Sequence, residues 1–335
     1  MEAEDIITGS SSTGPYIADN IRVGGSGKLT IVGFPYDMGC KLNGGRPGGE
    51  TGPTQFRKSL KQARLPKVNP FTKIDVSSIG LADEEDIAGL LELPDAHKQL
   101  ENRVYNVLNR GSIAFCIGGS NDQSYPNASA LLQVAGEDAV AVINIDAHFD
   151  VRPLNDGKAH SGSPFRLLVE DHRFKNAGGV FVEFACQGSQ CSVDHLGFLE
   201  ENQCGVIWLD REIRKVEVGD GKEIAGFNIK TQAGVRFASL LEELATKVKK
   251  IFVSFDIDSI DSAFCPGVSC ASIVGGLTAN EATEIALISG VHPKVALMDV
   301  SEFNPAVEGY RTGKLVANIY YNFALGINLR SEDNQ

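Results

Sequence analysis

The stretch AVAVINIDAHFD, residues 139–150, decides the fold. Its first seven residues are almost entirely apolar and rich in β-branched side chains, which predicts a buried strand over residues 139–145. Asp146, His148 and Asp150 follow at every second position, so in an extended chain their side chains point to the same side. The stretch therefore predicts a core strand that brings three polar side chains together at its end.

Further apolar runs resemble this strand, and helical patterns separate them. Near-continuous apolar strands that alternate with helices predict a parallel sheet covered on both faces. We therefore expect an α/β protein with a single three-layer domain, in which a mainly parallel central sheet is flanked by helices. The expected strands are residues 29–34, 113–117, 139–145, 180–185, 205–209, 251–255 and 294–298, and the expected helices are residues 53–61, 97–109, 128–135, 237–249, 279–288 and 314–324.

The chain carries no Pro/Ser-rich linker and no repeat of fixed period, so one domain over residues 28–330 is expected. Its start, MEAEDIITGSSSTG, is acidic and rich in Ser and Gly, and it lacks the basic and apolar segments of an export signal. We interpret residues 1–27 as a flexible N-terminal tail and residues 331–335 as a C-terminal tail.

The charge balance excludes some partners. The chain has 43 acidic and 31 basic residues and a formal net charge of −12, which argues against a nucleic-acid partner that needs a positive face. No apolar run reaches the roughly 18 residues that span a bilayer, so no membrane partner is expected. Seven cysteines, an odd number in a chain without an export signal, favour reduced thiols and a cytoplasmic location.

A second apolar run, IFVSF at residues 251–255, ends in Asp256 and Asp258 in the same manner. Because ligand sites of α/β folds gather beyond the carboxyl ends of the strands, the two motifs should converge. Four carboxylates and an imidazole would be unfavourable together without cations, and this donor set suits Mn²⁺ or a similar ion. The alternative is that each Asp only caps a helix or forms a turn. The recurrence of the motif favours the metal site.

Four ordered segments carry a family resemblance. INIDAHFD (143–150) and SFDIDSID (254–261) resemble the second and third metal-binding signatures of the ureohydrolase family, which includes arginases, agmatinases and formiminoglutamases. IGGSND (117–122) occupies the place of the first signature, and VSEFNP (300–305) is similar to the family's Glu-x-Asn-Pro segment. The resemblance covers the chain from Leu29 onward and implies an arginase-like fold.

The resemblance also implies a set of metal ligands. Two Mn²⁺ ions per subunit are expected from the family. Asn121 stands where the family has a histidine, and an amide oxygen is a poorer donor, so the ion next to Asn121 should be weakly held or absent. The implied ligands are Asn121, Asp146, His148, Asp150, Asp256 and Asp258.

The catalytic roles follow from the same resemblance. Two metal ions would make water nucleophilic at neutral pH for attack on a planar amidine-like carbon. Asp150 would accept its proton, and Glu302 would contact the amidine-like nitrogens of the substrate. His160, in the segment AHSGSPFR, is the candidate proton shuttle to the leaving amine, with a plain loop histidine as the alternative.

Two loops bear on the substrate. The segment NGGRPGG (43–49), followed by Gly52, Pro53 and Arg57, resembles the formiminoglutamase branch, although its Gly and Pro would also explain a simple turn. Arg152 lies two residues past Asp150, and a fixed cation there suits a substrate with carboxylates. A surface ion pair is the alternative for Arg152. The candidate substrate-binding residues are Asn43, Gly44, Arg46 and Arg152.

These features predict hydrolysis of N-formimino-L-glutamate to L-glutamate and formamide, the reaction that the resemblance assigns to histidine degradation. One alternative is a hydrolase of another guanidino or amidino compound. The other is a catalytically silent arginase-like scaffold with an impaired metal site, suggested by Asn121 and by Ser262, where the family commonly has proline. The resemblance also makes a homo-oligomer, a trimer or hexamer, the expected assembly.

Three cysteines are placed to line the mouth of the predicted site. Cys40 is next to the NGGRPGG loop, and Cys265 and Cys270 follow the third signature. Redox control through these thiols is one interpretation. Incidental buried thiols are the other, because cysteine is among the most buried residue types.

Overall fold

A nine-stranded sheet forms the centre of the molecule. The computed structural model describes residues 14–88, 92–270 and 273–330. The strand order is β1-β3-β2-β4-β11-β10-β5-β6-β7, and all neighbouring strands in it are parallel. The strands are β1 (Ile21–Val23), β2 (Leu29–Phe34), β3 (Leu81–Asp86), β4 (Ile113–Gly118), β5 (Val140–Ile145), β6 (Val180–Cys186), β7 (Gly205–Trp208), β10 (Lys250–Asp256) and β11 (Val295–Ser301).

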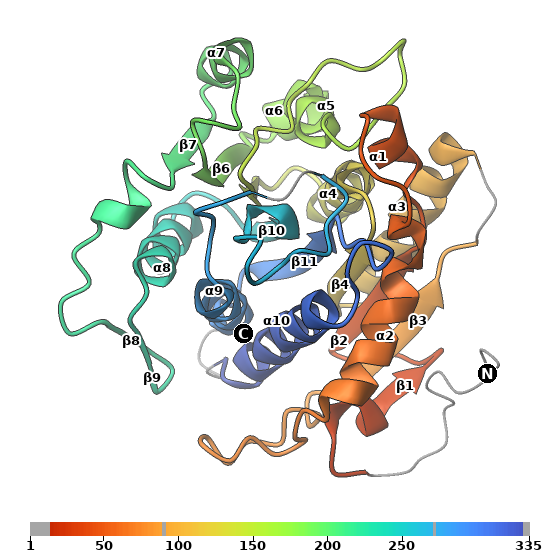
Figure 1. Ribbon diagram of the computed structural model, residues 1–335, viewed down its shortest axis with the longest axis vertical. Helices are drawn as coiled ribbons and strands as arrows, with labels where there is room; N and C mark the ends of the chain where they lie inside the picture. The colour runs from red at the N-terminus through yellow and green to blue at the C-terminus, as the bar shows by residue number, and fades with distance from the viewer. Residues whose placement is uncertain (1–13, 89–91, 271–272, 331–335) are drawn as a thin grey trace.

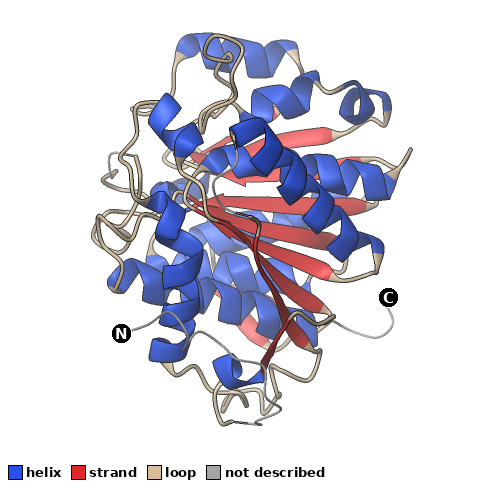
Figure 2. Ribbon diagram, turned by 90° about the vertical axis from the view of Figure 1, so that its right-hand side faces the viewer, coloured by secondary structure: helices blue, strands red, loops and turns tan. Residues whose placement is uncertain are grey.

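Helices cover both faces of this twisted sheet (Figure 2). Alternate residues of a strand point to opposite faces, so in β4 Phe115 packs in one apolar cluster and Cys116 in the other. Different helices contribute to the two clusters. The cluster with Phe115 contains residues of α2 (Gly52–Ala63), α8 (Gln232–Ala245), α9 (Ala279–Val291) and α10 (Arg311–Asn328). The cluster with Cys116 contains residues of α3 (Leu93–Asn109), α4 (Ser124–Ala135), α5 (Pro164–Glu170), α6 (His172–Asn176) and α7 (Val193–Glu201).

The predicted fold class is confirmed. All seven predicted strands are present, and every described pairing in the central sheet is parallel. The sequence reading missed β1 and β3, because β1 has only three residues and β3 reads LADEED. Buried Arg57 balances the acidic residues of β3. Its guanidinium forms ion pairs with Asp83 at 2.7 Å and with Asp86 at 2.6 Å.

The predicted N-terminal tail was too long. Residues 17–20 form a 3₁₀ turn and Ile21–Val23 form an edge strand paired with β3. Ile17 is fully buried, and its backbone N–H donates to the carbonyl of Leu65 at 2.9 Å. Apolar Ile17 and Ile21 within an otherwise polar stretch were the missed signal. The tail predictions for residues 1–13 and 331–335 lie outside the described residues.

The remaining elements lie at the periphery. A short helix α1 (Met38–Leu42) follows β2, and β8 (Lys222–Ile224) pairs antiparallel with β9 (Phe227–Ile229) away from the main sheet (Figure 1). Within the described parts of the chain, no helix is both long and apolar enough to cross a bilayer. Of these elements, α1 matters for function, because the loop after it contributes to the site described next.

Candidate metal centre

Four neighbouring strands place the candidate residues. In the order β4-β11-β10-β5, the carboxyl ends of these strands are adjacent. Asn121 follows β4, Asp146 follows β5, Asp256 ends β10 and Glu302 follows β11. Parallel strands that end at one edge therefore bring together residues that are far apart in the sequence.

The two Asp-x-(His/Asp) motifs form tight local turns. An Asp146 carboxylate oxygen accepts the backbone N–H of His148 at 2.8 Å, and an Asp256 carboxylate oxygen accepts that of Asp258 at 3.0 Å. Residues 146–150 are not extended, and Asp150 has a φ of +30°. The predicted convergence of the side chains holds, but a turn rather than an extended segment produces it.

Two groups of donor atoms result. One oxygen each of Asp146, Asp150 and Asp256 lie within 4.8 Å of one another, and the same holds for His148, Asp258 and the Cys270 thiol. The first three residues are buried, and the His148 ring is 12% exposed. The sequence reading placed Cys270 at the mouth of the site but not beside the ligands, because its approach depends on the fold of the loop after β10.

Electrostatics show what this donor set requires. Burial and the Asp146 carboxylate raise the pKa of Asp150 to about 8, and burial together with the Asp258 carboxylate raises the pKa values of Asp146 and Asp256. Burial disfavours protonated His148, but the neighbouring carboxylates outweigh it and raise its pKa. One buried oxygen of Asp258 has no hydrogen-bond partner. Crowded oxygen donors with an imidazole fit a divalent cation such as Mn²⁺.

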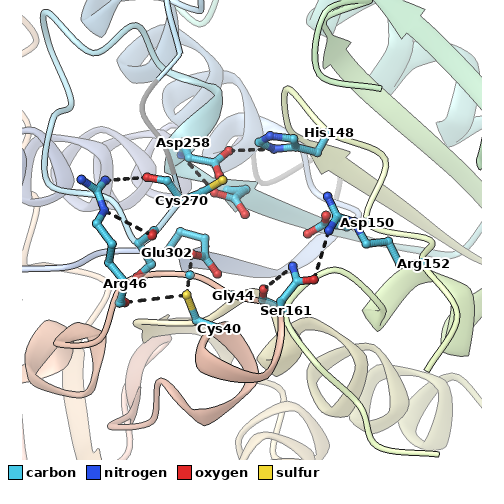
Figure 3. A pocket seen from close by; sticks show the side chains of 14 residues that line it. Cys40, Gly44, Arg46, His148, Asp150, Arg152, Ser161, Asp258, Cys270 and Glu302 are labelled. Carbon is cyan, nitrogen blue, oxygen red and sulfur yellow. Dashed lines mark hydrogen bonds and ion pairs between the residues drawn. The ribbon is translucent and has the colours of Figure 1, made fainter. Parts of the chain in front are cut away.

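A cavity of about 360 Å³ opens over these residues. Arg46 and Arg152 lie on opposite sides of it, with Glu302 and the carboxylates between them (Figure 3). Arg46 holds the rim, because its guanidinium donates to the carbonyl of Val268 at 2.6 Å and to that of Cys270. Arg152 donates to the side-chain oxygen of Asn43 at 3.1 Å.

Comparison with known proteins identifies the family. The model of the arginase family matches residues 27–326. The chain belongs to the arginase family. The solved structure of Trypanosoma cruzi formiminoglutamase with Mn²⁺ is 41% identical, covers 91% of this chain and 95% of its own, and has a TM-score of 0.79. Formimidoylglutamase of Staphylococcus aureus is 28% identical over 295 residues, 88% of this chain and 84% of that protein.

A more distant structure shares the fold alone. Formimidoylglutamase from Bacillus subtilis is 22% identical, with a TM-score of 0.80 over 98% of this chain and 96% of its own. The comparisons confirm three predictions from the sequence: the arginase family, the resemblance to its formiminoglutamase branch, and a hydrolase.

Both ends of the Asn121 side-chain amide make hydrogen bonds in this arginase-family site. Its amide nitrogen donates to Asp150 Oδ2 at 2.8 Å, and its side-chain oxygen accepts from the hydroxyls of Ser124 at 2.7 Å and Ser301 at 3.1 Å. The oxygen that was predicted to coordinate a metal is therefore engaged elsewhere. In the structure, Asn121 positions the Asp150 carboxylate through a hydrogen bond, and its role as a metal ligand stays a prediction.

Glu302 lies at the site, as predicted. It lines the cavity, and its Oε1 accepts the backbone N–H of Asn121 at 2.9 Å. Its backbone has a φ of +63°, and burial together with Asp258 raises the pKa of its side chain. With Oε1 held by this hydrogen bond, the other oxygen, Oε2, lies 3.7 Å from Cys40 Sγ.

His160 does not face the cavity, which corrects the predicted proton shuttle. Its side chain is buried; Nε2 donates to the carbonyl of Pro153 at 2.9 Å, and Nδ1 accepts the N–H of Gly162 at 3.2 Å. Both ring nitrogens are thus used to hold the loop. The neighbouring Ser161 lines the cavity instead.

The cysteine prediction is correct for two thiols of three. Cys40 and Cys270 line the cavity, whereas Cys265 is fully buried and does not. Burial raises the pKa of both cavity thiols, which lowers their thiolate fraction at neutral pH.

Proposed function

We propose that this protein hydrolyses N-formimino-L-glutamate to L-glutamate and formamide with the help of Mn²⁺, as a step of histidine degradation. The names of the two relatives described above support the reaction, and the Mn²⁺ in the Trypanosoma cruzi structure supports the metal. One observation in the chain itself carries the proposal: Arg152 faces the cavity as a cation without an acidic partner.

The contacts of Arg152 make this clear. In residues 14–88, 92–270 and 273–330, no carboxylate lies within ion-pair distance of its guanidinium. Asn43 accepts one of its N–H groups and in turn donates to Ser161 at 3.0 Å, so the guanidinium is oriented by neutral groups. A planar, oriented guanidinium suits a substrate carboxylate. The same cation disfavours the positively charged arginine and agmatine.

The metal ligands divide between two ions in this proposal. Asp146, Asp150 and Asp256 would hold one ion, and His148 with Asp258 the other. When bound, the ions would supply water of lowered pKa. This donor set speaks against a silent scaffold, because five of the six residues predicted as ligands lie in the two groups of donor atoms.

The chain's own side chains then act on the substrate. Glu302 is placed to accept hydrogen bonds from the formimino N–H groups. With Oδ2 held by Asn121, Asp150 has Oδ1 to accept a proton from the attacking water. As the oxygen joins the formimino carbon and the C–N bond to glutamate breaks, that proton goes to the departing amine. The second proton of the water moves to the formimino nitrogen, so formamide and L-glutamate result.

A steady-state assay of the Mn²⁺-loaded enzyme on formiminoglutamate, arginine and agmatine tests the function. Formiminoglutamate should be turned over fastest, and Arg152→Gln should lower its kcat/KM roughly 10- to 100-fold, mainly through KM. Lys158→Gln, in the same loop but outside the cavity lining, is the matched control. Faster turnover of arginine or agmatine, or of another amidino compound, would refute the substrate assignment.

Location and assembly belong to the same proposal. We infer a cytoplasmic homo-oligomer, a trimer or hexamer, from the family and from the reduced thiols that the cysteine pattern favours. Light scattering coupled to size-exclusion chromatography measures the assembly directly. A monomer at the concentrations used in the assay would contradict it.

A further inference from the structure

A second cavity lies at the opposite ends of the strands that carry the metal centre. It has a volume of about 330 Å³ and is lined by Lys28, Ile113, Lys250 and Val295, among other residues. Lys28 precedes β2, and the other three begin β4, β10 and β11. Three of the four strands around the candidate site, β4, β10 and β11, thus meet at their amino ends around this separate cavity.

The charged residues that line this cavity all have the same sign. No Asp or Glu is among its lining residues, although the chain as a whole has a net charge of −12. Across the described residues, none of these cations has a carboxylate within ion-pair distance. The five cations are Lys28, Lys249, Lys250, Lys294 and Arg330.

Two of these cations are fixed by neutral groups. Arg330 donates to the carbonyls of Gly290 at 2.7 Å and Val295 at 2.9 Å, and Lys294 donates to that of Val248 at 2.8 Å. Carbonyls near helix ends favour such cations, but they carry no net charge to neutralise them. Burial lowers the pKa of Arg330 to about 10, with no acidic group raising it. No acidic group therefore neutralises the positive charge of Arg330 and Lys294 at this cavity.

The other three cations reach solvent: Lys28 and Lys249 are exposed and Lys250 is half-buried. Within the described parts of the chain, no ion pair neutralises their ammonium groups. Burial and the charges of Arg330 and Lys294 lower the pKa of nearby His292 to about 4. Like charges gathered at one cavity repel each other, and an anion relieves this repulsion.

We propose that this cavity binds a small, multiply charged oxyanion of the phosphate or polycarboxylate class. The cations supply charge-assisted hydrogen bonds to its oxygens. Leu108, Leu131 and Val134 form apolar walls that accommodate a short carbon skeleton. The site is independent of the proposed substrate pocket, because the two cavities share no lining residue.

Calorimetric titration of the Mn²⁺-loaded protein at low ionic strength tests the proposal. Inorganic phosphate, glycerol 3-phosphate and tricarballylate serve as probes, because they chelate Mn²⁺ only weakly. We expect saturable binding of at least one probe at one site per chain. Binding by the two phosphates alone identifies the phosphate class, and binding by tricarballylate alone identifies the polycarboxylate class. No saturable binding by any probe overturns the proposal.

A charge-matched pair of variants locates the site. Lys249→Gln/Lys250→Gln should weaken binding at least about tenfold, because it removes two of the five cations. Lys58→Gln/Lys230→Gln removes the same charge from exposed positions elsewhere and should leave the affinity nearly unchanged. Equal losses in both variants would show general electrostatic attraction and overturn the site.

A chemical footprint gives a readout that does not depend on the variants. Acetylation of the intact protein followed by mass spectrometry should show that a saturating probe protects Lys28 and Lys249 relative to Lys58. Unchanged labelling of Lys28 and Lys249 under saturation would contradict binding in this cavity.

Discussion

The two ends of β4, β10 and β11 have opposite chemistry. At the carboxyl ends, Asp256, Glu302 and the carboxylates beside them crowd negative charge into a buried centre. At the amino ends, Lys250, Arg330 and their neighbours surround a cavity with positive charge. Both clusters lack enough opposite charge from the described parts of the chain, and each therefore indicates a ligand of the opposite sign.

Two buried carboxyl groups, Asp299 and Asp258, also differ in their surroundings. Asp299, in β11, accepts a hydrogen bond from the side-chain amide of Asn127 at 2.8 Å. Burial raises its pKa to about 6. Each carboxyl has one buried oxygen without a hydrogen-bond partner, but of the two only Asp258 lies in a group of candidate metal ligands. Asp299 therefore lies apart from the candidate ligands, whereas Asp258 is placed to hold a cation.

Removal of divalent ions should have the largest effect and should act on the carboxyl-end centre only. Dialysis against a chelator should abolish hydrolysis, and Mn²⁺ should restore it. At a free ion concentration about 100 times the Kd, binding should stabilise the fold by about 2.7 kcal/mol, measured by denaturant unfolding. Full activity after exhaustive chelation, verified by metal analysis, would contradict the proposed centre.

Asp299→Asn should show that burial disfavours the ionised form of this carboxyl. The folded-state pKa is raised, so the stability it contributes is present below the unfolded value near 3.8 and is lost as the pH rises through about 6. Relative to wild type, the variant should gain up to about 3 kcal/mol between about pH 4 and pH 7. Chemical unfolding of the ion-depleted protein measures this, and parallel pH curves for the two proteins would refute it.

Asn121→His should replace a hydrogen bond to Asp150 by a further metal ligand. An imidazole can coordinate a metal, whereas the present amide donates a hydrogen bond to Asp150. The weaker of the two Mn²⁺ affinities should tighten about tenfold or more. Asn121→Asp offers an oxygen donor of similar size for comparison. Unchanged affinities in the histidine variant, measured by titration calorimetry, would show that position 121 is too far from the ion to matter.

Ionic strength should have the smallest effect, and it should change the affinities of the two clusters for their ligands to different extents. Raising the ionic strength from about 0.01 M to about 0.15 M shortens the Debye length from about 30 Å to about 8 Å. Phosphate binding at the partly exposed amino-end cavity should weaken roughly three- to tenfold, while Mn²⁺ binding at the buried centre should change less. A larger loss for Mn²⁺ than for phosphate would reverse the expected ranking of their exposure.

The sequence predicted the site residues that directly follow core strands. It failed for residues whose role depends on the direction in which the side chain points. Asp146 and Asp256 were found because each directly continues an apolar run that could only be a core strand. The roles of Asn121 and His160 were not found, because they depend on hydrogen bonds to Ser301 and Pro153, which the chain brings near only on folding. The basic cavity was invisible for the same reason, since its lysines are scattered between residues 28 and 294.

The turns at Asp146 and Asp256 separate chemistry from recognition. Each aspartate holds the backbone of the residue two positions later, so the ligand geometry is encoded within a few consecutive residues at a strand end. Arg152 and Ser161 lie further along the same segment between β5 and α5, Asn43 follows α1, and the three side chains connect through their own hydrogen bonds. Substitutions at these three positions can therefore alter which substrate is admitted while the turns at the strand ends are kept, which makes them the positions to change when specificity is redesigned.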